Sequence, residues 1–134
     1  MRIAVGVRTV LRLVIRYPML AGFLARNGWP SVDTTPLFHA VVGATLVEGI
    51  ERGRFADVPV ALAQSALVGT LLGAIHATTT EPVSPELAER TAEVILRALG
   101  LAGDEARTTA SAPLATDSLD FDPVLGKLIA GESF

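Results

Sequence analysis

Residues 58–80 read VPVALAQSALVGTLLGAIHATTT, and the rest of the chain is best interpreted from this stretch. It contains no Asp, Glu, Lys or Arg, and its only ionisable side chain is that of His76. Small residues recur at every fourth position, so in a helix they form one ridge: Ala61, Ser65, Gly69, Gly73 and Ala77. A low ridge lets a second helix approach closely, which would compensate for two glycines that cost roughly 1 kcal/mol each relative to alanine. The stretch therefore predicts a helix closely packed against another helix, either in an ordinary core or in a second copy of the chain.

A membrane-spanning role for the same stretch is disfavoured by its composition. Its length approaches that of a transmembrane helix, but Pro59, Gln64 and Ser65 dilute it, and neither aromatic nor basic anchors flank it. The N-terminal segment Met1–Leu20 contains arginines and no acids, as targeting peptides do, but arginines at 8, 12 and 16 interrupt every apolar run. We therefore expect a soluble amphipathic helix at the N-terminus and no membrane partner.

Composition indicates one cytoplasmic domain that does not bind nucleic acid directly. A chain of 134 residues suits a single domain, and half of its residues are apolar. It has no cysteine, which excludes disulfides and thiolate metal sites and fits a reducing cytoplasm. The formal net charge is -3, with a basic first part and an acidic remainder. The arginines are dispersed along amphipathic segments, so they do not form a nucleic-acid patch.

Apolar periodicity and helix-breaking residues predict an all-α fold, an antiparallel bundle of about five helices. The expected helices are Ile3–Arg16, Met19–Arg26, a third from Pro36 to a stop at Gly53, Asp57–Thr80 and Ser84–Leu99. Thr35 and Asp57 are the expected N-caps of the third and fourth helices, and Trp29–Thr35 is expected to be a loop. We expect the packed domain to span residues 1–103. Residues 104–134 are expected to form a flexible Thr/Ser/Asp-rich tail, largely disordered or loosely packed, with a small apolar patch at Val124–Ala130.

The residues that could carry chemistry do not form a recognisable catalytic set. His39 and His76 are too far apart in sequence to form a local metal motif, and the chain has no metalloprotease, phosphate-loop or serine-hydrolase motif. Asp117, Asp120 and Asp122 lack the spacing and the glycine of a calcium-binding loop, so a solvated acidic tail explains them better. The sequence thus predicts no catalytic residues, no metal, no cofactor and no enzyme activity.

Four segments in order resemble a known family. They are RYPML at 16–20, VEGIERGRF at 47–55, the alanine-rich central helix, and AEVILRALGL at 92–101. Together they resemble the C-terminal regulatory domain of TetR-family transcriptional repressors, over about Ile3 to Ala106. In that family a helix-turn-helix domain precedes this region. No such segment is present here, so we expect this chain to be a shortened form of a regulator and to reach DNA only through a domain it does not itself contain.

The resemblance implies a homodimer that binds a small effector. The last two long helices of such repressors form a four-helix bundle with those of a second subunit, and a two-fold axis requires a self-complementary patch. The implied interface residues are Ala61, Ser65, Gly69, Gly73, Ala77, Thr91, Val94, Ile95 and Ala98. The earlier helices surround a mostly apolar pocket, whose candidate residues are Leu20, Phe23, Leu24, Trp29, Phe38, His39, Val42 and His76. For each apolar candidate, ordinary core packing is the alternative.

Two other functions fit the same sequence. One is a stand-alone helical interaction protein that pairs with an intact regulator. The other is a small membrane-associated helical protein, an alternative with which the apolar central helix is compatible. Size-exclusion chromatography with light scattering separates the regulatory domain and the interaction protein from the membrane-associated protein, and a detergent-free monomer would count against the dimer bundle.

Overall fold

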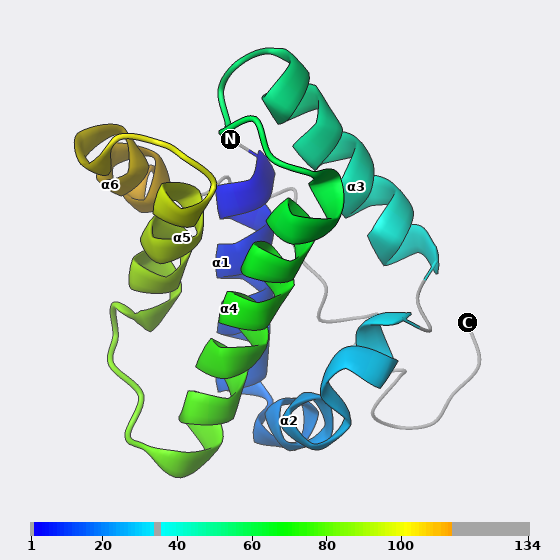
Figure 1. Cartoon of the computed structure of the whole chain (residues 1–134). Helices are drawn as coiled ribbons and strands as arrows, with labels where there is room; N and C mark the ends of the chain where they lie inside the picture. Colours follow the sequence, from blue (N-terminus) through cyan, green and yellow to red (C-terminus); the bar gives the residue numbers. More distant parts are fainter. Residues whose placement is uncertain (1, 34–35, 114–134) are drawn as a thin grey trace.

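Six α-helices make up the described part of the chain (Figure 1). The structure is a computed structural model that describes residues 2–33 and 36–113, with the backbone alone at 29–33 and 36–39. The helices are α1 (Arg2–Arg16), α2 (Pro18–Asp33), α3 (Pro36–Glu51), α4 (Val60–Thr80), α5 (Leu87–Ala98) and α6 (Gly103–Ser111). The described residues contain no strand, which confirms the all-α prediction.

The hydrophobic core lies where α1, α4 and α5 meet. Leu11 of α1, Ile75 of α4, and Ile95 and Leu96 of α5 are each at most 1% exposed. Helix α1 packs against α5 and α4, α2 packs against α4, and α3 lies along the first half of α4. In Figure 1, α4 passes in front of α1, and α5 lies beside both of them on the left. The core is aliphatic and alanine-rich, as the composition predicts.

Helix α2 is longer than predicted. The sequence places a loop at Trp29–Thr35, but the helix continues to Asp33 with a kink at Gly28. Gly28 has φ 49° and ψ −127°, a conformation that a residue with a side chain rarely adopts. Asn27-Gly28 therefore marks a kink in the helix, and the prediction that the helix ends there is wrong. Thr35, the expected cap of α3, lies outside the described residues, and α3 begins at Pro36 as predicted.

The starts of α4 and α5 also differ from the sequence prediction. Helix α4 begins at Val60 with Pro59 in the cap position and no side-chain cap, so the predicted cap at Asp57 is wrong. Helix α5 begins at Leu87, three residues after Ser84. The Ser84 hydroxyl accepts a hydrogen bond from the backbone N–H of Glu86 at 3.2 Å, so it stabilises the turn before the helix.

Helix α6 overturns the expectation of a loosely packed segment from residue 104. Ala106 and Ala110 are at most 1% exposed, because α6 lies against α5 and touches α1. Asp104 and Glu105 occupy its first turn, where negative charge stabilises a helix. The packed domain thus reaches Ser111. The remainder of the predicted tail, with Val124–Ala130 and the three aspartates, lies outside the described residues.

Helix α4 is the one helix of the described chain that is long and apolar enough to cross a membrane. Its length is 21 residues, and only 28% of its most apolar window is buried within the molecule. This assignment rests only on the length and the apolar composition of the helix, and core helices of soluble proteins meet the same two criteria. The low burial shows that α4 presents much of its apolar surface to the outside.

Candidate functional site

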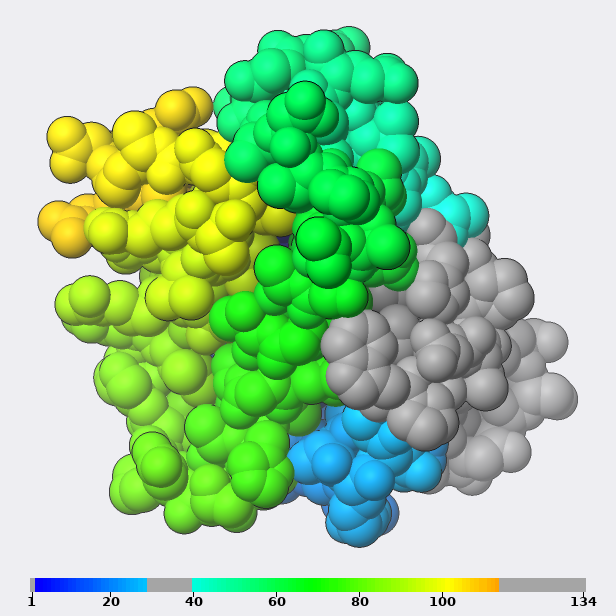
Figure 2. Space-filling model, in the orientation of Figure 1, coloured from blue at the N-terminus to red at the C-terminus, as the bar shows by residue number. Residues whose placement is uncertain are grey.

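The small-residue ridge of α4 faces outward. Ala61, Ser65, Gly69 and Gly73 are exposed, and Ala77 is half-buried. A side chain built at Gly69 or Gly73 would meet no atom within 4 Å. Figure 2 shows this face, with α4 and α5 forming adjacent bands from top to bottom. The ridge is therefore not used for packing inside the described part of the domain.

Larger apolar side chains are also exposed on α4 and α5. Leu62 of α4 is 62% exposed, Val94 of α5 is 53% exposed, and Ala98 is also exposed. Thr91 and Ile95, also predicted at the interface, are 6% and 0% exposed and belong to the core of the domain itself. Helix α5 has one apolar side toward α1 and another toward solvent. Its apolar residues are therefore divided between the core of the domain and the exposed surface.

An apolar pocket lies between α1, α3 and α4. Its volume is about 250 Å³, just under the lower end of the usual range for ligand pockets. Its described lining residues are Arg2, Ile3, Gly6, Val7, Val10, Val41, Val42, Thr45, Leu67 and Leu71. Among them Arg2 and Thr45 are the two with polar side chains. The pocket can thus take an apolar group of modest size.

Among the five predicted ligand residues whose side chains the structure describes, Val42 alone lines this pocket. Leu20 and Leu24 pack half-buried against the core at α2, and Phe23 on the same helix is 51% exposed. His76 is exposed on α4 and is not part of the pocket lining. The side chains of Trp29, Phe38 and His39 lie outside the described residues. Half of the described lining comes from α1, which contributed no residue to the predicted pocket.

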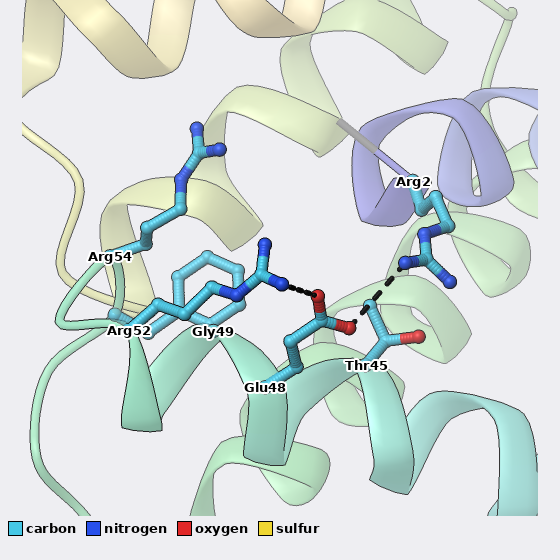
Figure 3. Close-up of a pocket in the computed structure, with 7 residues that line it drawn as sticks. Arg2, Thr45, Glu48, Gly49, Arg52 and Arg54 are labelled. Carbon is cyan, nitrogen blue, oxygen red and sulfur yellow. Dashed lines mark hydrogen bonds and ion pairs between the residues drawn. The ribbon is translucent and has the colours of Figure 1, made fainter.

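A second pocket, of about 270 Å³, adjoins the first and is rich in arginine (Figure 3). Its lining residues are Arg2, Thr45, Glu48, Gly49, Arg52, Arg54 and Phe55. The Glu48 carboxylate lies 3.0 Å from Arg52 and 3.4 Å from Arg2. Arg54 is 3.8 Å from Glu105 of α6. We refer to this second pocket below as the arginine pocket.

The wall of the arginine pocket depends on a close approach between two residues. The ring of Phe55 is 7% exposed and lies against Gly49 of α3. A Cβ atom at position 49 would come within 2.3 Å of that ring, so only glycine leaves room for it. No local sequence pattern indicates this pocket, because Arg2 and Glu48 are 46 residues apart.

A separate ionic cluster holds α1, α5 and α6 together. Arg8 is 4% exposed, donates a hydrogen bond to the carbonyl of Ala112 and lies 3.4 Å from Glu89. Arg12 lies 2.8 Å from the same carboxylate. Partial burial alone would raise the pKa of Glu89, but a hydrogen bond from its own backbone N–H and the contacts and charges of Arg12 and Arg8 lower that pKa below 4.5. The cluster is structural, because one carboxylate of α5 pairs with two arginines of α1 and the carbonyl of Ala112 takes a further hydrogen bond.

The described residues contain no group of three or more His, Cys, Asp or Glu side chains that could hold a metal ion. What they do contain is an apolar pocket, an adjoining cationic pocket and an uncovered apolar helix face. These features describe an all-helical domain with a candidate ligand pocket and a candidate interface.

The family follows from comparison with known proteins. The family model described as the tetracyclin repressor-like C-terminal domain matches residues 2–112, and the chain belongs to this family. The match confirms the resemblance seen in the sequence and extends beyond Ala106 to include α6. Searches of curated proteins and of solved structures returned no match. Membership implies a ligand-binding and dimerisation role within a regulator.

Proposed function

We propose that this chain is the effector-sensing and homodimerising domain of a TetR-like transcriptional regulator. The single observation that carries the proposal is the outward-facing small-residue ridge of α4, a charge-free helix that is largely uncovered. Soluble monomers rarely leave a large contiguous apolar surface exposed. A second copy of the domain would cover this apolar surface. Contacts between the regulator and its operator would come through a DNA-binding domain outside these residues. We place the protein in the cytoplasm, where the regulators of this family generally act.

The proposed interface consists of the ridge with Leu62, Val94 and Ala98. From Ala61 to Ala77 the ridge runs about 24 Å along the helix, at 1.5 Å per residue. Small side chains along this length let the α4 helices of two copies approach closely, and the exposed Leu62 and Val94 supply the larger groups that fill the space beside them. The patch can be self-complementary, as a two-fold interface requires.

The proposed effector site is the apolar pocket between α1, α3 and α4. Because α4 contributes Leu67 and Leu71 to the pocket and the ridge to the interface, one helix belongs to both. A ligand that favours one position of α4 would therefore bias the arrangement of the two subunits, which is the thermodynamic requirement for allosteric control.

The interface is tested by Gly69→Leu and Gly73→Leu, measured by size-exclusion chromatography with light scattering over a range of concentrations. Overpacking a close contact costs about 1–3 kcal/mol, which corresponds to a roughly 5- to 150-fold weaker dimer. A Cβ atom at either position would meet no atom within 4 Å in the monomer, so the fold should remain intact by circular dichroism.

Gly43→Leu is the matched control. Gly43 is also a helical glycine with open space at its Cβ position, but it lies on α3 away from the ridge. We expect this variant to dimerise as the unaltered chain does. A folded monomer for the unaltered chain would contradict the homodimer and favour pairing with an intact regulator, while partition into lipid vesicles would favour the membrane-associated alternative.

A further inference from the structure

We propose that the ligand of this domain is an amphipathic carboxylate, with its hydrocarbon part in the apolar pocket and its carboxylate in the arginine pocket. This inference rests on the proposed function, in which the apolar pocket is the effector site. It adds the chemical class of the ligand and a second group of residues that bind it. Neither the family match nor the apolar pocket by itself indicates a charged head group.

The two pockets adjoin, because Arg2 and Thr45 line both of them. Arg2 begins α1 and Thr45 lies in the middle of α3, so the boundary between the pockets is the point where these helices meet. The Thr45 hydroxyl already donates a hydrogen bond to the carbonyl of Val41 at 2.8 Å. A polar ligand group at this boundary would therefore depend on the arginines.

The arginine pocket has more positive than negative charge around it. Three guanidinium groups, from Arg2, Arg52 and Arg54, face two carboxylates, Glu48 and Glu105, within 4 Å. Glu51 is a further exposed acid at the end of α3, but it does not line the pocket. A cationic head group would be repelled by the guanidinium groups, whereas an anionic one would join them.

Glu48 shows that these arginines can hold a carboxylate. Its two oxygens are shared between Arg52 and Arg2, one oxygen to each side chain (Figure 3). Arginine binds carboxylates through paired N–H donors in one plane, which makes it the usual residue for recognising this group. Arg54 makes the longest contact of the three, 3.8 Å to Glu105, so it is the side chain most easily redirected to a ligand.

The exposure of the three arginines suits a site that closes over its ligand. Their side chains are 78%, 70% and 53% exposed for Arg2, Arg52 and Arg54. Long side chains in solvent can turn toward a carboxylate without repacking the core. The Phe55 ring behind them provides an apolar wall on which the first methylene groups of the ligand can lie.

The test compares three probes with the same eight-carbon chain, namely octanoate, 1-octanol and octylammonium, by isothermal titration calorimetry on the full chain at low ionic strength. We expect octanoate to bind about tenfold more tightly than octanol and octylammonium to bind weakest, since a hydrogen bond to a charged group contributes more than a neutral one. Added sodium chloride should weaken octanoate binding and leave octanol binding unchanged.

The double variant R52Q/R54Q should lose about tenfold in octanoate affinity and retain octanol affinity. Arg90→Gln is the matched control, because Arg90 is an exposed arginine of α5 that pairs with Glu86 away from both pockets. Equal affinities for octanoate and octanol, or an unchanged octanoate affinity in R52Q/R54Q, would overturn the carboxylate proposal.

The variant Val42→Trp separates failure of this inference from failure of the proposed function. A tryptophan at position 42 fills the apolar pocket, so it should abolish binding of both octanoate and octanol. If octanol binds and Val42→Trp abolishes that binding while the arginine variants change nothing, the apolar pocket stands and the carboxylate site is wrong. If none of the three probes binds, the effector pocket itself is wrong, and the inference fails with it.

Discussion

Helices α1 and α4 distribute polar and apolar residues in opposite ways. Helix α1 buries a charged side chain, Arg8, and surrounds it with partners from α5 and α6. Helix α4 has no charged residue, yet it leaves a ridge of small residues and Leu62 exposed. A charge is buried in a stable protein only where partners satisfy it. Contacts within the domain thus satisfy the two terminal nitrogens of Arg8, although its Nε is buried without a hydrogen-bond partner. The exposed apolar side of α4, by contrast, requires a partner from outside the domain.

This difference indicates where the domain depends on a partner. The α1–α5–α6 side has ion pairs, a closed core and a helix end held by Arg8. The α4 face has space at Gly69 and Gly73 and apolar side chains in solvent. Substitutions on the first side should change the stability of the subunit, and those on the second side should change association.

The largest expected effect comes from truncating the core next to the proposed interface. Ile95→Ala removes a side chain that is 0% exposed, and we expect it to lower the free energy of unfolding by about 2–5 kcal/mol. Leu62→Ala is the matched substitution on the uncovered face, where the unfolding free energy of the monomer should change by less than about 0.5 kcal/mol. Urea unfolding under monomeric conditions measures both, and light scattering should show a weaker dimer for Leu62→Ala alone. Equal destabilisation by the two substitutions would contradict the distinction between the two sides.

A smaller effect is expected from Arg8→Ala. The substitution leaves the carbonyl of Ala112 without its donor and removes one of the two arginines beside Glu89. Loss of a partner to a buried polar group costs about 1–3 kcal/mol, so the unfolding free energy should fall by that amount. The exposed Arg90→Ala serves as the control and should change it by less than about 0.5 kcal/mol. If Arg8→Ala is neutral in urea unfolding, the ionic cluster does not hold α6 in place.

The smallest effect is a dependence on pH that originates in Glu89. Folding lowers its pKa below 4.5, so at intermediate pH the unfolded chain binds more protons than the folded one. The contribution of Glu89 to stability is therefore fully present above about pH 5 and is lost as the pH falls through the folded-state pKa. Glu89→Gln should remove this part of the pH dependence, measured as unfolding free energy between about pH 3 and pH 6. An unchanged slope in the variant would show that other carboxyl groups cause it.

Much of the fold followed from local sequence signals, and the exceptions share a physical cause. Prolines and glycines marked the separations between the first five helices, because their backbone preferences act locally. Helix α6 escaped prediction because it buries only alanines, Ala106 and Ala110, and otherwise reads as a Thr-rich loop. The burial of Arg8 was missed as well, because its partners Glu89 and Ala112 lie more than 80 residues away in the sequence.

The candidate site was predicted less completely than the fold. The ridge was recognisable because its repeat of four belongs to one helix, and its outward orientation agrees with the interface prediction. Ile95 was assigned to the interface because apolar periodicity does not say which of two neighbours an apolar residue faces. The arginine pocket depends on residues separated by most of three helices, so no local pattern could indicate it.

The packing of α1 against α5 has a consequence for synthesis on the ribosome. Arg12 and its partner Glu89 are 77 residues apart in sequence. At about 5–20 residues per second, the segment that contains α5 follows α1 after about 4–15 seconds. During that interval Leu11 and Val14, which are at most 1% exposed in the folded domain, have no α5 to pack against. The nascent chain thus exposes the apolar face of the amphipathic helix α1 during this interval, so we expect the domain to complete its folding only after α5 has been synthesised.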